Sequence, residues 1–261
     1  MNNVFFDGTN FELLLGDSFK LLKKMEPKSI DMIFADPPYF LSDGGVSCHS
    51  GRQVSVDKAE WDKALSPEEK LKYNRKWIKL CREVLKDAGT IWISGTHHNV
   101  YSIGMALELE GFSIINNIIW QKPNPSPNLA CRCFTNSTET ILWARKQLTP
   151  KKKGNHTFNY QLMKEINGGK QMKDVWILPL PAKKEKIHGK HPTQKSLPLL
   201  ERIVLAATSE GDLILDPFCG SGTTGVAAVK LNRKFIGIDN VQEYLEIAKK
   251  RYEDLEVTED E

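Results

Sequence analysis

Short apolar runs, each bounded by turn residues, recur along this chain of 261 residues. Five of them span Phe11 to Asp17, Ile30 to Asp36, Gly89 to Gly95, Asp212 to Pro217 and Lys234 to Asp239. Runs of this length without strict polar alternation are typical of parallel strands that are buried on both faces. Segments with helical patterns lie between them. This alternation with short links predicts an α/β fold, a doubly wound and mostly parallel sheet with helices on both faces.

Two of the predicted helices carry start signals. The first begins with Ser66 as N-cap, Pro67 at the first helical position and Glu69 three residues after the cap, which is a capping box. The second repeats the signal with Asn240 and Glu243. These signals place helices directly before the third predicted strand and directly after the last one.

Three further segments add to this pattern. The runs Phe112 to Trp120 and Thr138 to Ala144 predict an antiparallel hairpin at the edge of the sheet. The segment Phe40 to Lys63 is rich in Gly and Ser and directly follows a predicted strand. Loops at the carboxyl ends of parallel strands commonly carry binding sites, so this segment is predicted to be a mobile active-site loop.

The segment from Gln121 to Lys190 has little periodicity and most of the positive charge. From residue 122 to 190 there are 14 Lys and Arg against 4 Asp and Glu, a local +10 within a total of +3, so the remainder carries −7. A basic segment on an acidic body indicates a polyanionic partner, most often nucleic acid, although charge alone leaves a solvated basic face open. We therefore predict a main domain of residues 1–120 and 191–261 and a DNA-recognition insert of residues 121–190.

Composition excludes several other classes. With 40% hydrophobic and 26% charged residues the chain is an ordinary globular protein, and no run approaches the roughly 20 apolar residues of a membrane span. The first ten residues lack the basic and apolar regions of a secretory signal. Five scattered cysteines predict reduced thiols and a cytoplasmic location. The sequence CRC at Cys131 to Cys133 lacks the second pair of a zinc site, so no metal is predicted.

The stretch LILDPFCGSGTTGVAAVKLNRKFIGID contains the first chemical motif. A strand ends at Asp216, a turn holds Gly220 and Gly222, a helix follows, and a second strand ends at Asp239. Glycines let a ligand approach the backbone closely, and a terminal acid can accept hydrogen bonds from two ribose hydroxyls. The motif predicts a nucleoside site. Its spacing leaves a dinucleotide site open because Gly225 supplies a third glycine, whereas the lysine of a P-loop is absent.

The second motif is DPPY, at Asp36 to Tyr39. Proline fixes its own φ and restricts the residue before it, so the Asp36 carboxylate and the Pro37 carbonyl are held rigidly. Neither Pro37 nor Pro38 has an N–H to compete for these acceptors. Two such acceptors can take both hydrogens of an exocyclic amine and direct its lone pair toward an electrophile. Tyr39 offers an aromatic face for the ring that carries the amine.

DPPY together with DPFCGSGTT resembles the S-adenosylmethionine-dependent amino methyltransferases of DNA. The order of the motifs, with a basic insert between them, resembles the β-class. HPTQKSLPLLERIV, which has Ser196 where the family has proline, and GDSF resemble segments that contact the cofactor. The resemblance implies a Rossmann-like methyltransferase fold, a catalytic role for Asp36, Pro37, Pro38 and Tyr39, and S-adenosylmethionine as cofactor. The implied cofactor residues are Asp17, Asp36, His191, Thr193, Lys195, Asp216, Phe218, Gly220, Ser221, Gly222, Thr223, Thr224 and Asp239.

Within that family, DMIFADPPYFLSDGG, QVSVDKAEWDK and GKQMKDVW resemble the second adenine methyltransferase of GATC restriction–modification systems. The resemblance implies N6-adenine methylation in a short palindrome of double-stranded or single-stranded DNA, beside a cognate restriction endonuclease. Relatives that modify GANTC share KPNP and GKQMK, so GANTC is the competing specificity. Whether the chain forms a homodimer stays open.

Other chemistries are alternatives. An N4-cytosine methyltransferase faces the same amine problem, but the resemblance gives that group serine more often than aspartate before the two prolines. A C5-cytosine enzyme needs a cysteine nucleophile, and Cys219 merely occupies the glycine turn. A non-catalytic nucleic-acid-binding module would not need DPPY, and neither would a nicotinamide-dependent oxidoreductase.

The adenine mechanism carries two expectations. A base inside a duplex is inaccessible and must rotate out of the stack, whereas single-stranded DNA avoids most of that cost. Asp36→Ala should abolish transfer while cofactor binding is retained. Tyr39→Phe should keep most activity if the ring only stacks on the base.

Overall fold

The computed structural model describes residues 3–40, 46–49, 52–55, 65–129, 131–147, 155–189 and 191–259. Much of the predicted active-site loop, Phe40 to Lys63, therefore falls outside the described residues. Among the residues described, no helix has the length and apolar character that crossing a membrane requires.

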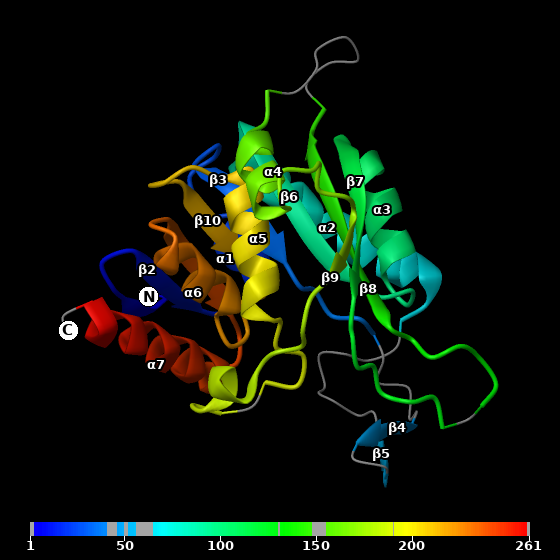
Figure 1. The fold of residues 1–261 in the computed structure, drawn as a ribbon. Coiled ribbons are helices and arrows are strands. Elements are labelled where there is room, and N and C mark those ends of the chain that lie inside the picture. Colours follow the sequence, from blue (N-terminus) through cyan, green and yellow to red (C-terminus); the bar gives the residue numbers. More distant parts are fainter. Residues whose placement is uncertain are drawn as a thin grey trace.

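A nine-stranded sheet forms the centre of the molecule (Figure 1). Five neighbouring strands are mutually parallel, the antiparallel β1 adjoins β2 at one edge, and β8 is antiparallel to both of its neighbours. In spatial order the strands are β1 (Val4–Asp7), β2 (Phe11–Leu15), β11 (Lys234–Asp239), β10 (Leu213–Asp216), β3 (Ile30–Ala35), β6 (Leu85–Gly95), β8 (Thr138–Lys146), β7 (Phe112–Gln121) and β9 (Val175–Ile177). A separate two-stranded sheet pairs β4 (Val46–His49) with β5 (Arg52–Ser55).

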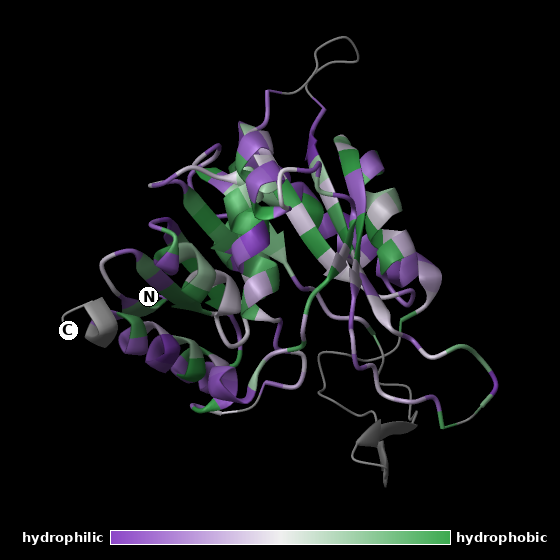
Figure 2. Cartoon of the chain, viewed as in Figure 1, coloured by the Kyte–Doolittle hydropathy of each residue, from purple (hydrophilic) through white to green (hydrophobic). Residues whose placement is uncertain are grey.

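Helices cover both faces of the sheet. One face carries α1 (Ser18–Leu22), α2 (Pro67–Val84) and α3 (Val100–Leu109). The other carries α4 (Tyr160–Ile166), α5 (Leu197–Ala207), α6 (Thr223–Lys230) and α7 (Gln242–Glu259). Figure 2 shows the strands as predominantly hydrophobic and much of α7 as hydrophilic. The predicted doubly wound α/β fold is confirmed.

Alternating side chains of one strand supply two separate cores. On β3, Met32 and Phe34 belong to the core under α5, whereas Ile33 and Ala35 belong to the core under α2. All four side chains are buried, because successive residues of a strand point to opposite faces and both faces are covered. This explains why the strand reads as a continuous apolar run.

The predicted hairpin forms, but it is not at the edge. β7 and β8 pair antiparallel from Phe112 opposite Lys146 to Gln121 opposite Thr138. Beyond β7 lies β9, which is parallel to it and comes from the stretch predicted as an insert. The Trp120 indole N–H donates to the carbonyl of Leu178 at 2.9 Å, which fixes this returning segment against the hairpin. The prediction that the hairpin lies at the edge of the sheet was wrong, because β9 has only three residues and is too short to show a periodic pattern in the sequence.

Helix starts follow the sequence signals unevenly. The capping box of α2 is confirmed, with Ser66 Oγ accepting from the Glu69 N–H and Glu69 accepting from the Ser66 N–H. The last helix begins at Gln242, two residues after the expected cap. The Asp239 carboxylate accepts the Val241 N–H at 2.9 Å, so the chain is still held by the preceding strand end there.

Connections from two neighbouring strands leave in opposite directions. β3 leads through α2 to β6 on one side, whereas β10 leads through α6 to β11 on the other. In open α/β sheets, ligands bind at such a switch point, outside the carboxyl ends of the strands.

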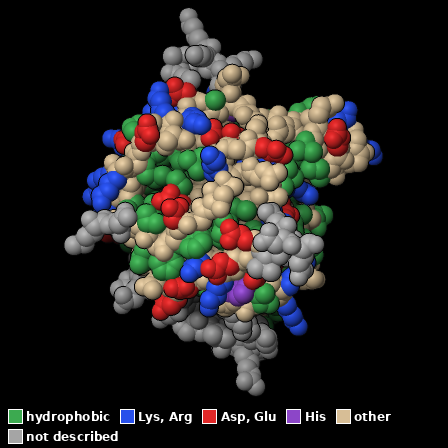
Figure 3. Space-filling model, turned by 90° about the vertical axis from the view of Figure 1, so that its left-hand side faces the viewer, with side chains coloured by type: hydrophobic (Ala, Val, Ile, Leu, Met, Phe, Trp, Pro, Cys, Tyr) green, Lys and Arg blue, Asp and Glu red, His purple; other side chains and the backbone are tan. Residues whose placement is uncertain are grey.

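On the side where β2 and α7 lie, acidic and basic side chains are interspersed with hydrophobic ones (Figure 3).

Candidate active site

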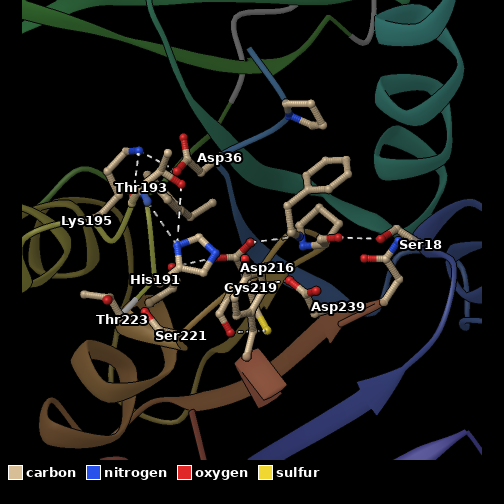
Figure 4. A pocket seen from close by; sticks show the side chains of 18 of the residues that line it. Ser18, Asp36, His191, Thr193, Lys195, Asp216, Cys219, Ser221, Thr223 and Asp239 are labelled. Carbon is tan, nitrogen blue, oxygen red and sulfur yellow. Dashed lines mark hydrogen bonds and ion pairs between the residues drawn. The ribbon is translucent and has the colours of Figure 1, made fainter. Parts of the chain in front are cut away.

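Four aspartates meet at the carboxyl edge of the sheet. Asp17 follows β2, Asp36 follows β3, and Asp216 and Asp239 end β10 and β11. Because these strands are neighbours and parallel, their ends converge on one cavity of about 340 Å³, which all four residues line. Figure 4 shows Asp36, Asp216 and Asp239 around this space. Its volume is in the range of small-molecule and cofactor sites.

The residues that the sequence predicts to bind the cofactor come together here. All of them except Gly222 line the cavity. They are Asp17, Asp36, His191, Thr193, Lys195, Asp216, Phe218, Gly220, Ser221, Thr223, Thr224 and Asp239.

The two glycines of the turn serve different purposes. Gly220, at φ +48°, has no room for a side chain, since a Cβ there would lie 2.8 Å from His191 Nε2. Its N–H donates to Asp239 Oδ2 at 2.8 Å. Gly222, at φ +72°, is the N-cap of α6, and a Cβ there would lie 2.6 Å from the Cβ of Ala248. Gly220 therefore permits the close approach of His191 at the cavity, whereas Gly222 permits helix packing.

The part of the cavity around Gly220 and Asp239 is called the cofactor side, and the part around Asp36 the amine side. The donors and acceptors of the cofactor side fit the nucleoside part of S-adenosylmethionine. Asp239 accepts backbone hydrogen bonds from Gly220, Val241 and Asn240 and keeps an acceptor site for a ribose hydroxyl. Burial raises its pKa, although these backbone hydrogen bonds oppose the shift. The aromatic rings of Phe19, Tyr73 and Phe218 also line the cavity and suit a purine ring.

Asp216 ends β10, lines the cavity and is 2% exposed. Burial raises its pKa to about 7, and the charges of Asp36 and Asp239 act in the same direction. Hydrogen bonds from Thr224 Oγ1 at 2.6 Å and the Phe218 N–H at 3.0 Å partly oppose the shift. The ionisation of this carboxyl therefore responds to nearby charge around neutral pH.

Cys219 and His191 are also perturbed by burial. The pKa of the Cys219 thiol lies well above its usual value because of burial and the charges of Asp239 and Asp216. That suppresses the thiolate a cytosine-C5 enzyme would need. Burial lowers the pKa of His191 to about 4, so its ring, which packs edge-on against Tyr244, stays neutral.

The Asp36 carboxylate is held by three side-chain donors. Its Oδ1 accepts from the Tyr39 hydroxyl at 2.7 Å and from the Ser94 hydroxyl, and its Oδ2 accepts from Lys195 Nζ. Burial opposes ionisation, but the Lys195 charge and these hydrogen bonds outweigh it and hold the Asp36 pKa below its usual value. Asp36 is therefore an ionised acceptor at neutral pH.

A chain of amides holds the DPPY turn. The Pro38 carbonyl accepts from Asn99 Nδ2 at 2.8 Å, and Asn99 Oδ1 accepts from Asn74 Nδ2 at 2.8 Å. Trp77 in turn donates to Asn74 at 3.1 Å. The next residue of the turn, Phe40, has φ +57°, a strained conformation that redirects the chain after DPPY.

Tyr39 is placed differently from the expectation. Pro38 lines the cavity and Pro37 is buried, but the Tyr39 ring is only 8% exposed and lies outside the lining. Burial and the charges of Asp36 and Glu139 raise its pKa well above the usual value, so the hydroxyl remains a donor. The ring's stacking role stays a prediction, and the hydroxyl has a role at Asp36 that sequence reasoning missed.

Sequence reasoning also missed three other polar residues near Asp36. Ser94 is the second-last residue of β6, while Glu139 is the second residue of β8 and contacts Lys122 at 2.5 Å. Because β8 is antiparallel, its first residues lie at the same edge as the last residues of β6 and β7. In the sequence, the signal for this cluster was an acidic residue, Glu139, near the start of the hairpin's second strand. Its proximity to Asp36 could be recognised only once the order of the strands was known.

Comparison with known proteins identifies the family. The model of the N6/N4 DNA methylases matches residues 30–250, well over half of the chain. The chain belongs to this DNA methylase family. It is therefore an enzyme, a DNA methyltransferase.

Relatives match over nearly the whole length. The chain is 63% identical to the type II methyltransferase M2.DpnII of Streptococcus pneumoniae, over 97% of this chain and 93% of that protein. It is 64% identical to the type II methyltransferase M2.LlaDCHI of Lactococcus lactis subsp. cremoris, over 96% and 92%. The crystal structure of an M1.HpyAVI–SAM complex is similar at 33% identity and a TM-score of 0.67, covering 92% of this chain and 99% of that one.

The described residues contain no group of three or more His, Cys, Asp or Glu that could hold a metal ion. Cys131 and Cys133 are both exposed. The absence of a metal remains a prediction.

Proposed function

We propose that this DNA methyltransferase transfers the methyl group of S-adenosylmethionine to N6 of adenine in GATC, as the second methyltransferase of a restriction–modification system. The observation that carries the proposal is the Asp36 carboxylate, paired with Lys195 in the lining of a nucleoside-type cavity. The DPPY motif, the resemblance to GATC adenine methyltransferases and the M2 relatives support it.

The chain's own groups position the amine. Asp36 accepts one hydrogen of the adenine amine and the Pro37 carbonyl accepts the other, so the nitrogen lone pair leaves the ring's conjugation. S-adenosylmethionine, when bound, supplies a methyl group already activated by a sulfonium. The protein contributes orientation and charge complementarity more than covalent chemistry. Asp216 and Asp239 give the cofactor side an acidic character that suits a cationic ligand.

The target base must leave the duplex to reach this edge. Base flipping costs a few kcal/mol, and stacking on an aromatic ring such as that of Tyr39 returns about 1–3 kcal/mol. Tyr39 would have to become accessible for that contact. Single-stranded DNA is a further substrate because it avoids most of the unstacking cost.

Residues 121–190 form the target-recognition segment of this proposal, and residues 1–120 and 191–261 form the catalytic domain. The excess positive charge of the segment suits the DNA backbone. Its strands β8 and β9 both belong to the central sheet, which fixes the segment relative to Asp36. The enzyme acts in the cytoplasm beside a cognate endonuclease, and a homodimer is compatible with the proposal.

The experiment uses purified protein, tritiated S-adenosylmethionine and oligonucleotides. Duplexes with GATC, with GANTC and with neither site are compared, each also as a single strand. Digestion to nucleosides then identifies the product. N6-methyladenine confined to GATC is expected. N4-methylcytosine, or transfer to GANTC alone, would overturn the proposed chemistry or site respectively, and no label in DNA would overturn both.

A further inference from the structure

A buried chain of charges leads from the hairpin to the catalytic carboxylate. Lys122 contacts Glu139, Lys195 lies 3.6 Å from Glu139 Oε2, and Lys195 also pairs with Asp36. Two ammonium groups and two carboxylates balance each other. The Lys195 and Asp36 side chains are only 7% and 14% exposed, so neither can rely on water in place of a partner.

Lys195 covers the free part of Asp36. Tyr39 and Ser94 already donate to Oδ1, and a carboxylate oxygen accepts about two hydrogen bonds. The remaining capacity lies on Oδ2, where Lys195 Nζ donates. An exocyclic amine that binds Asp36 must use the one acceptor site left on this oxygen, directly beside the lysine ammonium, so two donors crowd the same oxygen.

Glu139 offers Lys195 a second partner. Its Oε1 contacts Lys122 at 2.5 Å, which fixes the side chain in place. Within the part of the chain that the structure describes, its Oε2 has only long contacts, 3.6 Å to Lys195 Nζ and 3.5 Å to the Tyr39 hydroxyl. A short movement of the Lys195 ammonium would therefore exchange the Asp36 carboxylate for the Glu139 carboxylate as its partner. The buried ammonium would stay paired throughout.

We infer that Lys195 occupies the binding position of the target amine in the DNA-free enzyme and moves from Asp36 to Glu139 when the flipped base enters. This inference rests on the proposed function and makes Lys195 and Glu139 positioning residues for the amine. Lys195 keeps Asp36 ionised until the base arrives, and Glu139 makes its displacement favourable. Lys122 holds Glu139 ready.

Several titratable groups surround Asp36, and any pH effect must be read against all of them. They come from the DPPY turn, the segment before α5, β8 and β10, and they are Tyr39, Lys195, His191, Glu139 and Asp216. Among these, Lys195 is the cation in direct contact with Asp36. Its removal leaves burial as the dominant influence on that carboxyl.

The first test compares pH profiles of methyl transfer to a GATC duplex. In Lys195→Met, Asp36 becomes protonated at a higher pH, so kcat/KM should fall roughly tenfold per pH unit on the acid side and recover at alkaline pH. Lys195→Arg retains the charge and should keep the wild-type profile. Lys230→Met, which removes a lysine from the exposed pair with Glu201, is the matched control and should also keep it. An unshifted profile in Lys195→Met would contradict the inference.

The second test separates displacement from charge. Glu139→Gln leaves Lys195 on Asp36, so its pH profile should stay wild-type while KM for DNA rises by about tenfold. In Lys195→Met nothing needs displacing, so adding Glu139→Gln should then have little further effect on KM. Equal effects of Glu139→Gln in both backgrounds would overturn the partner exchange. If Lys195→Met does not fold, Glu139→Gln alone still tests the inference, because an unchanged KM for DNA in that variant would contradict it.

The third test measures binding without transfer. Duplexes carry either adenine or purine, which lacks the 6-amino group, at the target position. In the wild type the amine must displace Lys195, so the two duplexes should bind with similar affinity. In Lys195→Met at alkaline pH, the ionised Asp36 should favour adenine by about tenfold more than in the wild type. Unchanged discrimination would contradict the inference.

The wild-type enzyme distinguishes this inference from the proposed function. If it methylates adenine and the variants fail these expectations, the inference alone falls. If it transfers no methyl group to adenine, the proposed function and the inference fall together.

Discussion

The two sides of the cavity are assembled in different ways. The hydrogen-bonded part of the cofactor side comes from one stretch, with Thr224 bonding Asp216 across 8 residues and Gly220 bonding Asp239 across 19. The amine side joins Asp36 to Ser94 across 58 residues and to Lys195 across 159. A local stretch can be recognised as a motif, whereas the amine side exists only once the sheet has formed.

The two sides also treat their carboxylates oppositely. Asp216 and Asp36 both line the cavity and both are buried enough for desolvation to matter. Asp216 has no cation in contact among the described residues, and burial raises its pKa to about 7. Asp36 has Lys195, and its pKa falls below the usual value. A built-in cation thus keeps the amine side charged, while the cofactor side gains its charge when a cationic ligand arrives.

The largest expected effect is on the amine side. Asp36→Ala removes the charged acceptor of the amine, so the methyl-transfer rate should fall on the order of 10³-fold. S-adenosylmethionine affinity should change little, because the adenosine contacts lie on the other side. A tritiated-methyl assay and titration calorimetry measure the two quantities. Full turnover by Asp36→Ala would remove the distinction between the two sides.

The next effect belongs to the cofactor side. Gly220→Ala places a methyl group against His191 in a left-handed conformation, so S-adenosylmethionine affinity should fall by roughly tenfold or more. Gly211→Ala is the matched control, since Gly211 also has positive φ, +80°, but no atom within 4 Å of the added Cβ. Both variants should lose stability in thermal unfolding. Only Gly220→Ala should lose cofactor affinity, and equal losses would make the effect one of backbone strain alone.

A pH effect of similar or smaller size is expected at Asp216. Its carboxyl ionises as pH rises through about 7, and the ionised form attracts a cationic ligand. S-adenosylmethionine should therefore bind up to about tenfold more tightly at pH 8 than at pH 6. In Asp216→Asn, the affinity for S-adenosylmethionine should depend less on pH. Any titration of the ligand itself affects both proteins equally, so it cancels in this comparison. An identical pH dependence in both proteins would show that Asp216 does not couple to the cofactor.

The smallest effect concerns Tyr39. Because its hydroxyl donates to Asp36 at 2.7 Å, Tyr39→Phe should lower kcat by about threefold to tenfold. A purely stacking role predicts almost full activity instead. Steady-state kinetics on a GATC duplex separate the two, and a wild-type kcat would assign the residue to the base ring rather than to the carboxylate.

The parallel strands could be predicted because each is a continuous apolar run. Lys234–Asp239 matches its predicted bounds, and the ends of the other four differ by a few residues. Val4–Asp7 and Val175–Ile177 were missed, since strands this short form only through pairing with a distant partner. That omission also put the hairpin at the edge.

The site was predictable to the extent that it is local. Asp216, Gly220 and Asp239 stand in one motif, and the cavity collects them as expected. Glu139 and Ser94 carry no motif, because their proximity to Asp36 depends on β8 lying between β6 and β7. Lys195 was assigned to the cofactor by resemblance, and its contact with Asp36 follows from how the segment before α5 crosses the strand ends.

The most direct measurement is the structure of the enzyme with a GATC duplex and a non-reactive cofactor analogue. The account predicts a flipped adenine whose N6 lies within about 3 Å of Asp36 Oδ2, with the Lys195 ammonium displaced toward Glu139. An adenine amine that contacts other groups, with protein side chains closing the space beside Asp36, would contradict it.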